Sequence, residues 1–283
     1  MTEASPTWRA LLAEATSRLD DHGEAQRIVE EVTGWSAAEV VTHLDDESTA
    51  LTFARWSALV ERREAGEPLQ YVLGAWGFRT LDLLVDRRVL IPRPETEQVV
   101  GVALEALDAM ALARAVVVDL GTGSGAMALS IAVERPKVDV WATDRSPEAL
   151  AVARANLAGV GRAATRVRLV EGDWYDALPR ELAACVDLIV ANPPYIAATD
   201  ELPDEVRKWE PAGALVAGPT GLEAIEVIVA GAHGWLAPRG VLVVEIGAGQ
   251  AADAARLAQA AGFAQVEVRP DLAGRSRALR AAG

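Results

Sequence analysis

The segment AVVVDLGTGSG, residues 115–125, joins an apolar run to a glycine-rich turn and decides the fold. A continuous Val-rich run is typical of a strand buried on both faces of a parallel sheet. The glycines allow a sharp turn, and a helix beginning near Ala126 would direct its free N–H groups at a ligand. A tight turn without a ligand would also fit this segment taken alone. The candidate ligand contacts are Gly121, Thr122, Gly123, Ser124 and Gly125.

Outward from this segment, strand-like and helical patterns alternate through residues 91–283. The apolar runs lie at 115–120, 138–144, 166–172, 185–192, 240–247 and 263–270. Such alternation predicts an α/β domain with a mostly parallel sheet and helices on both of its faces. Ligands of these sheets bind beyond the carboxyl ends of the strands, so the residues that follow each strand are the functional candidates.

Residues 1–67 show a different, purely helical pattern. Helices are predicted after a Ser5–Pro6 start, over 24–32, after a Ser36–Glu39 capping box, and over 46–65. No catalytic constellation lies in this region. It is therefore either a recognition module for a partner or a stabilising cap, and surface pattern does not separate the two.

Between these regions the hydrophobic period changes to two. Apolar residues alternate between Gln70 and Leu90, with glycines at the turns, which predicts a β-hairpin. The predicted division is a helical domain at 1–67, a linker containing the hairpin at 68–90, and a catalytic domain at 91–283.

Acidic residues follow the next two strands. Asp144 closes the run 138–144, where a carboxylate can accept hydrogen bonds from both hydroxyls of a ribose. Asp173 and Trp174 follow the third run, where they could contact an adenine ring, although Asp173 would serve equally as a turn residue. These features predict a bound adenosine, and a dinucleotide such as NAD would satisfy them as well.

The tetrapeptide Asn192-Pro193-Pro194-Tyr195 ends the run 185–192 and distinguishes these possibilities. Prolines supply carbonyl acceptors without N–H donors and hold the backbone rigid, so the loop is an acceptor surface suited to an NH2 group. The side chain of Asn192 and the carbonyl of Pro193 can each accept one N–H, while Tyr195 can stack on the planar group. The pattern predicts methyl transfer from S-adenosylmethionine to an amide or amine nitrogen.

Composition excludes several classes of protein. The net charge of -14 disfavours nucleic acid as a partner. Cys185 is the only cysteine, which excludes an intrachain disulfide and a thiolate zinc cluster, and its apolar surroundings predict a buried side chain. No basic, apolar leader begins the sequence and no long apolar run follows, so we expect a cytoplasmic protein that does not contact membranes.

Taken together, these residues resemble the release factor glutamine methyltransferase family, also called HemK or PrmC, over nearly the whole chain. Further motifs that carry the resemblance are PLQYVLG at 68–74, VLIPRPETE at 89–97, WEPAGAL at 209–215, GPTGLEAI at 218–225 and VEIGAGQ at 244–250. Arg93 of the second motif is a candidate wall of the site, and its glutamates, Glu95 and Glu97, are expected to start a helix.

The resemblance implies a class I, Rossmann-like methyltransferase with a seven-stranded sheet and a helical domain that helps to hold the substrate. The implied reaction transfers methyl from S-adenosylmethionine to N5 of the glutamine in the GGQ motif of class 1 release factors. It also implies donor contacts at Gly121 to Gly125, Asp144 and Trp174, and substrate contacts at Asn192 to Tyr195. The alternatives are an N-methyltransferase acting on adenine or guanine in nucleic acid, and a binding module without turnover.

Overall fold

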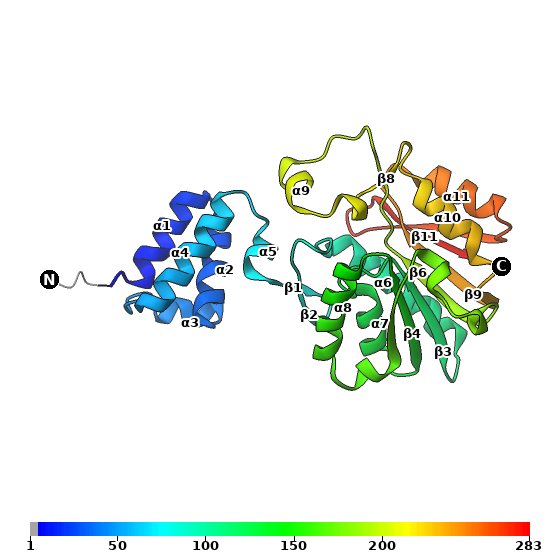
Figure 1. Ribbon diagram of the computed structural model, residues 1–283, viewed down its shortest axis with the longest axis horizontal. Helices are drawn as coiled ribbons and strands as arrows, with labels where there is room; N and C mark the ends of the chain where they lie inside the picture. Colours follow the sequence, from blue (N-terminus) through cyan, green and yellow to red (C-terminus); the bar gives the residue numbers. More distant parts are fainter. Residues whose placement is uncertain (1–4) are drawn as a thin grey trace. The chain divides into compact units, whose positions relative to one another are not determined.

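The protein is described by a computed structural model over residues 5–283, so the first four residues of the predicted helical domain lie outside the described range. The chain divides into two compact units, one that ends at Ala75 and one that runs from Trp76 to Gly283 (Figure 1).

The first unit is a bundle of short helices around an apolar core. Its helices are α1 Trp8–Leu19, α2 His22–Thr33, α3 Ala37–Thr42, α4 Ala50–Glu64 and α5 Leu69–Leu73. Leu11, Ile28 and Trp56 are almost fully buried at its centre. The predicted capping box is present, because Ser36 and Glu39 each accept a hydrogen bond from the other's backbone N–H.

Three of the predicted helix starts are wrong. Helix α1 is capped by Thr7 rather than Ser5, because Pro6 is held outside the helix by hydrogen bonds from the N–H and Oγ of Ser48 (both 2.9 Å). Helix α2 begins at His22 rather than residue 24, and α4 begins at Ala50 rather than 46. Helix α5 was not predicted, since its five residues are too few for a clear helical period.

The predicted hairpin consists of β1 Ala75–Phe78 and β2 Leu81–Leu84. Arg79 at its turn has a positive φ of 52°. The turn is held by two helices, α6 Pro94–Met110 and α7 Ala126–Glu134. Arg79 N–H donates to Glu97 Oε1 (3.0 Å) in the first turn of α6, and the Arg79 guanidinium binds Glu134 (2.5 Å) at the end of α7. Glu97 therefore anchors the hairpin in addition to standing in the first turn of α6.

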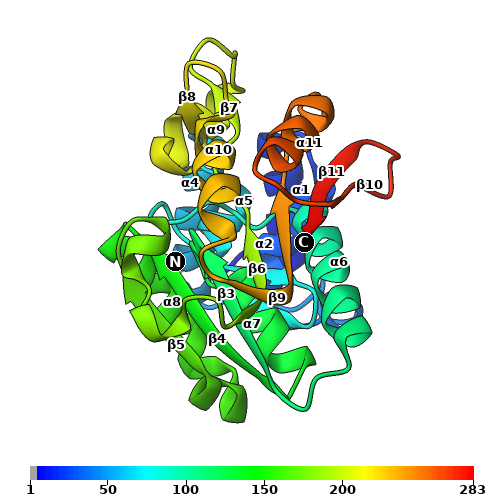
Figure 2. The same ribbon diagram turned by 90° about the vertical axis from the view of Figure 1, so that its right-hand side faces the viewer.

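The second unit is built on a seven-stranded sheet, as the family resemblance implied, although the apolar runs predicted only six of its strands. The strand order is β10-β11-β9-β6-β3-β4-β5 (Figure 2). The strands are β3 Ala115–Leu120, β4 Val138–Asp144, β5 Val167–Glu171, β6 Val186–Ala191, β9 Leu236–Glu245, β10 Gln265–Pro270 and β11 Ser276–Ala282. All neighbours are parallel except that β11 runs antiparallel to β9 and β10.

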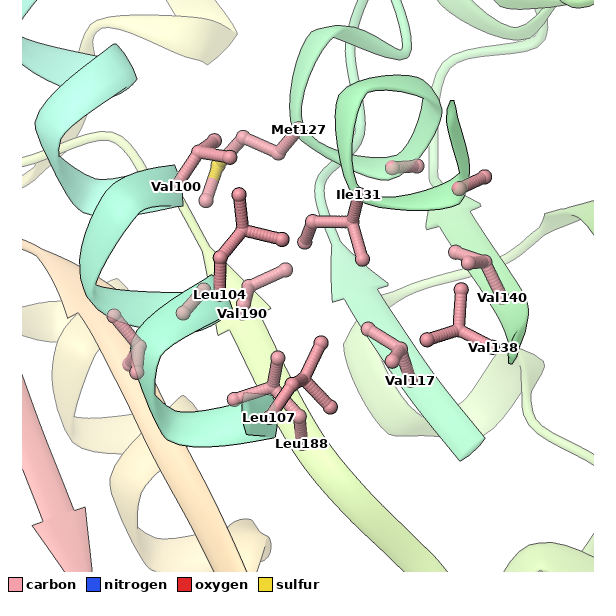
Figure 3. Close-up of a cluster of buried hydrophobic side chains, with 14 of the residues drawn as sticks. Val100, Leu104, Leu107, Val117, Met127, Ile131, Val138, Val140, Leu188 and Val190 are labelled. Carbon is pink, nitrogen blue, oxygen red and sulfur yellow. The ribbon is translucent and has the colours of Figure 1, made fainter. Parts of the chain in front are cut away.

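Helices cover both faces of this sheet. Helices α6 Pro94–Met110 and α7 Ala126–Glu134 pack on the face that carries Val117 and Leu188 (Figure 3). Helices α10 Glu223–Ala232 and α11 Ala251–Ala260 pack on the face that carries Val118 and Ile189. Successive residues of each central strand thus enter opposite cores, which is why the strands are apolar throughout.

One further helix, α8 Pro147–Gly159, and several short elements complete the second unit. The short elements are α9 Asp204–Trp209, the paired strands β7 Ile196–Ala197 and β8 Val216–Gly218, and the 3-10 turns Gly161–Arg166, Trp174–Ala177, Arg180–Leu182 and Ala212–Ala214. Cys185 is exposed, contrary to the prediction, because it lies in the turn before β6 begins at Val186. Within residues 5–283, no helix is both long and apolar enough to cross a membrane.

Candidate active site

The register of the central strands brings the predicted loops together. Leu120 at the end of β3 pairs with Ala191 of β6 on one side and with Thr143 of β4 on the other. The glycine turn, Asn192 and Asp144 therefore leave the sheet side by side at its carboxyl edge. This is the edge at which open α/β sheets bind ligands.

A cavity of about 480 Å³ lies over this edge, within the range of about 300–1,000 Å³ usual for small-molecule sites. The predicted residues that line it are Gly121, Thr122, Gly123, Ser124, Asp144, Asp173, Trp174, Asn192 and Pro194. Three other predicted residues, Gly125, Pro193 and Tyr195, lie next to these but do not line the cavity.

The glycine turn needs glycine for two reasons. Gly121, Gly123 and Gly125 have φ values of 74°, 57° and 86°, a region that L-residues with side chains rarely adopt. A Cβ on Gly121 would lie 3.3 Å from the Trp174 ring, and one on Gly125 would lie 3.0 Å from Leu129. No atom would lie within 4 Å of a Cβ on Gly123, so the backbone there faces open space in the cavity.

Two carboxylates support this turn. Asp144 accepts hydrogen bonds from Gly123 N–H (2.8 Å) and Ser146 N–H (2.9 Å), one on each oxygen, and burial raises its pKa. Asp119 is fully buried and accepts from Thr122 Oγ1 (2.7 Å) and Ala128 N–H (3.1 Å). Desolvation raises the pKa of Asp119 to about 7. A carboxylate oxygen has two lone pairs, so Asp144 can still accept from a ligand hydroxyl.

The segment after β5 forms one wall of the cavity. Gly172 has a φ of 153°, and a Cβ there would lie 2.8 Å from Ala177, so only glycine fits at this position. Trp174 has a positive φ of 44° and places its ring over Gly121. An adenine ring in this part of the cavity would find an aromatic surface at Trp174 and a carboxylate at Asp173.

Asn192 stands at the centre of the site. Its Nδ2 donates to Thr96 Oγ1 (3.2 Å), while no described residue donates to its Oδ1. Pro193 is buried and Pro194 reaches the cavity. The ring of Tyr195 packs against the core beneath the sheet edge, and its hydroxyl donates to Glu245 Oε1 (3.4 Å), so stacking on a ligand would require the ring to move.

Gln250, to which the sequence assigned no role, holds the tetrapeptide Asn192–Tyr195 in place. Gln250 Nε2 donates to the carbonyls of Tyr195 (2.9 Å) and Gly221 (3.0 Å), and its Oε1 accepts from Gly247 N–H (2.8 Å). All of its amide atoms are thus used to join three loops at one point. The only sequence signal for this residue was its place in the VEIGAGQ motif.

The remaining wall comes from residues 88–96 and 211–217. These segments are joined by Glu210, which is buried and accepts hydrogen bonds from Ile91 N–H (3.2 Å) and from the Arg93 guanidinium. Arg93 is therefore a link between the two segments and is not among the residues that line the cavity. Residues 5–283 contain no group of three or more His, Cys, Asp or Glu side chains that could hold a metal ion.

Comparison with known proteins identifies the family. The chain matches family models for the PrmC N-terminal domain at residues 8–74 and the methyltransferase small domain at 100–208. It is 46% identical over 281 residues to the release factor glutamine methyltransferase of Burkholderia pseudomallei, covering 98% of this chain and 96% of that protein. The chain belongs to the release factor glutamine methyltransferase family. The protein of this family from Moorella thermoacetica is 43% identical over 97% of this chain and 98% of its own length.

Solved structures with lower identity share the fold. A methyltransferase from Pyrococcus furiosus superposes with a TM-score of 0.51 at 19% identity, over 83% of this chain and 98% of that chain. The hMettl16 catalytic domain, solved with the MAT2A 3'UTR hairpin 6, gives 0.54 at 14% identity, over 83% and 82%. These comparisons confirm the predicted methyltransferase fold and the predicted family.

Proposed function

We propose that the protein transfers a methyl group from S-adenosylmethionine to the side-chain nitrogen N5 of the glutamine in the GGQ motif of class 1 release factors. The observation that carries this proposal is the placement of Asn192 beside the glycine turn, with its Oδ1 free to accept. The names of the relatives supply the substrate, because an acceptor surface alone would suit any planar NH2 group.

Residues at or just after the carboxyl ends of β3, β4 and β5 hold the donor. The backbone at Gly121 to Gly125 approaches its charged end, Asp144 accepts from the ribose hydroxyls, and Trp174 with Asp173 contacts the adenine. The open space at Gly123 and the remaining lone pairs of Asp144 fit this ligand. When bound, the donor supplies an electrophilic methyl group on a sulfonium.

Asn192 and Pro193 orient the substrate. The nitrogen lone pair of an amide is delocalised, so the reaction gains most from holding that nitrogen in line with the methyl group. Asn192 Oδ1 and the Pro193 carbonyl accept its two N–H groups. The same two dipoles stabilise the positive charge that grows on nitrogen as the bond forms. Pro194 shapes the rigid loop, and Tyr195 anchors that loop through its packing against the core and its hydrogen bond to Glu245.

No strong base is required for this reaction, because the nitrogen becomes acidic once it carries the methyl group and can then release its proton to water. The helical residues 1–67 are assigned to recognition of the release factor. A translation factor as substrate also implies that the enzyme acts in the cytoplasm.

The test is to incubate the purified protein with isotopically labelled donor and, separately, with release factor, RNA and DNA. Peptide mass spectrometry then locates the label. We expect label on the GGQ glutamine and none on nucleic acid, in keeping with the net charge of -14. Label on an adenine or guanine alone would establish the alternative N-methyltransferase, and donor binding without transfer to any substrate would indicate a binding module.

A further inference from the structure

The side chain of Gln250 joins the far end of the tetrapeptide Asn192–Tyr195 to two neighbouring loops. Its Nε2 carries two protons and donates to the carbonyls of Tyr195 (2.9 Å) and Gly221 (3.0 Å). Its Oε1 accepts from Gly247 N–H (2.8 Å). Gln250 is half-buried and is not among the residues that line the cavity. Its amide therefore holds protein groups together and does not bind a ligand itself.

The chemistry of the three partners requires an amide at this position. Two carbonyls need two donors, and the Gly247 N–H needs an acceptor, so one NH2 group and one oxygen satisfy all three. The same partners fix which way the amide points. If it were reversed, its oxygen would face two carbonyl oxygens and its NH2 would face an N–H, and no hydrogen bond would form.

The backbone around Gln250 is shaped to receive its amide. A Cβ on Gly221, whose φ is 80°, would lie 2.7 Å from the Tyr195 carbonyl oxygen, and a Cβ on Gly247 would lie 2.9 Å from Gln250 Oε1. Carbon and oxygen atoms do not approach so closely, so either side chain would displace the amide or the carbonyl that it binds. Gln250 itself is fixed at the start of α11, since its carbonyl accepts from Ala254 N–H (2.9 Å).

This junction holds one of the two ends of the tetrapeptide. Asn192 directly follows Ala191, the last residue of β6, so the sheet fixes the near end. Pro193 and Pro194 lie between the ends and have no N–H groups with which to bind a neighbour. The position of the Pro193 carbonyl, and the direction in which Asn192 leaves the sheet, therefore depend on where Tyr195 is held.

We propose that Gln250 is a positioning residue for methyl transfer, which holds Tyr195 so that the acceptors of Asn192 and Pro193 meet the nitrogen to be methylated. This inference rests on the proposed function, since it concerns the same reaction. Gln250 touches neither the donor nor the reacting nitrogen and acts through the tetrapeptide. A displacement of about 1 Å at a reacting centre can cost about a hundredfold in rate, so loss of the junction should appear in kcat.

The first experiment compares Gln250→Met with Gln259→Met. Methionine keeps the length of the side chain and removes all three hydrogen bonds. We expect Gln250→Met to lower kcat by about ten- to a hundredfold, with the Kd for the donor, measured by calorimetry, within about threefold of the wild type. Gln259→Met makes the same change at an exposed position of α11 and should keep both wild-type values.

Two outcomes of this comparison would overturn the inference. A wild-type kcat in Gln250→Met would show that the tetrapeptide does not need the junction. Loss of donor binding together with turnover would show that Gln250 supports the fold of the whole site, because a residue that acts only through the tetrapeptide leaves the glycine turn and Asp144 unchanged.

The second experiment is a double-mutant cycle that tests whether Gln250 acts through Asn192. Once the Asn192 side chain is removed, Gln250 has only the Pro193 carbonyl left to position. In single-turnover measurements we expect Gln250→Met to cost less than about fivefold in the Asn192→Ala background, against about ten- to a hundredfold in the wild-type background. Equal losses in both backgrounds would mean that Gln250 acts independently of Asn192 and would overturn the inference.

A third variant perturbs the same junction while keeping the glutamine. In Gly221→Ala the added Cβ must displace the Tyr195 carbonyl, since it would otherwise lie 2.7 Å from that oxygen. We expect kcat to fall by about tenfold or more. This variant keeps the inference testable if Gln250→Met does not fold. A wild-type kcat would show that the position of the Tyr195 carbonyl does not limit the transfer, which would overturn the inference.

The outcomes separate this inference from the proposed function. If the wild type places no label on the release factor, the proposed function fails and the inference fails with it. If the wild type methylates the glutamine of the release factor while Gln250→Met and Gly221→Ala both keep the wild-type kcat, the inference alone is overturned.

Discussion

Replacement of Asn192 by alanine gives the sharpest test of the proposed chemistry. The change removes one of the two acceptors assigned to the substrate NH2 group and leaves the Pro193 carbonyl in place. Loss of one preorganised hydrogen-bonding group at a reacting centre typically costs about 10²- to 10³-fold in kcat, or about 3–4 kcal/mol. We therefore expect Asn192→Ala to retain at most about one hundredth of the wild-type kcat.

The same replacement should have little effect on folding. Asn192 is only half-buried, and its side chain forms a single hydrogen bond within residues 5–283, to Thr96 at 3.2 Å. Losing a bond of this kind costs about 0.5–1.5 kcal/mol, which lowers the Tm of a protein of this size by only a few degrees. The fall in kcat would therefore exceed anything that partial unfolding could cause at 25 °C.

The assay is single-turnover transfer of labelled methyl to the release factor, with donor affinity measured separately by calorimetry. Gln259→Ala, which removes an exposed side-chain amide from α11, is the matched control and should keep the wild-type rate. Retention of more than about a third of the wild-type kcat by Asn192→Ala would refute the assigned role. Loss of donor binding together with turnover would show that Asn192 is mainly a donor contact.

Three further outcomes are expected. Gly123→Ala should weaken donor binding in calorimetry by about tenfold or more, because the added methyl group enters the cavity. It should also lower the free energy of unfolding by about 1 kcal/mol, because alanine is strained at a φ of 57°. Unchanged affinity would exclude the donor from this turn. Asn156→Asp should lower the free energy of unfolding, measured with urea, by about 2–4 kcal/mol. The change removes the Nδ2 group that donates to the carbonyls of Leu84 (3.1 Å) and Ser124 (2.9 Å) and places a carboxylate against them. An unshifted urea midpoint would contradict this expectation. The free energy of unfolding of Asp119→Asn should increase relative to that of the wild type as the pH rises from about 4 to about 7. The reason is that the folded wild type keeps a proton on Asp119 that the unfolded chain releases in this range. A constant difference between the two proteins across that range would argue against the raised pKa.

The sequence predicted the location of the site because strand periodicity is strong in its central strands. Once β3, β4 and β6 are recognised as parallel, their carboxyl ends must meet, and the glycine turn, Asp144 and Asn192 are brought together by topology alone. The glycine turn was also predictable in detail, since Gly121 and Gly125 are required both by positive φ and by close neighbours.

The supporting contacts could not be predicted in the same way. Thr96 meets Asn192 across 96 positions of sequence, and Gln250 meets Tyr195 across 55, so no local pattern reports either pair. Strand β11 was missed because its residues 276–282 include two arginines and lack a continuous apolar run. Tyr195 was expected to face the ligand, but an apolar core beneath the sheet edge and the carboxyl group of Glu245 hold its ring and hydroxyl.

The strand order also has a consequence for how copies of this protein behave together. The two strands that end the sheet, β5 and β10, offer unpaired backbone groups on which a foreign strand could assemble. Strand β10 presents exposed Glu267 and Arg269, joined by an ion pair (2.6 Å), and finishes at Pro270, which has no N–H to donate. Strand β5 presents exposed Arg168 and Glu171. Pairing of a strand from another copy with either outer strand would require desolvating these charges. The outer strands therefore disfavour aggregation through the edges of the sheet.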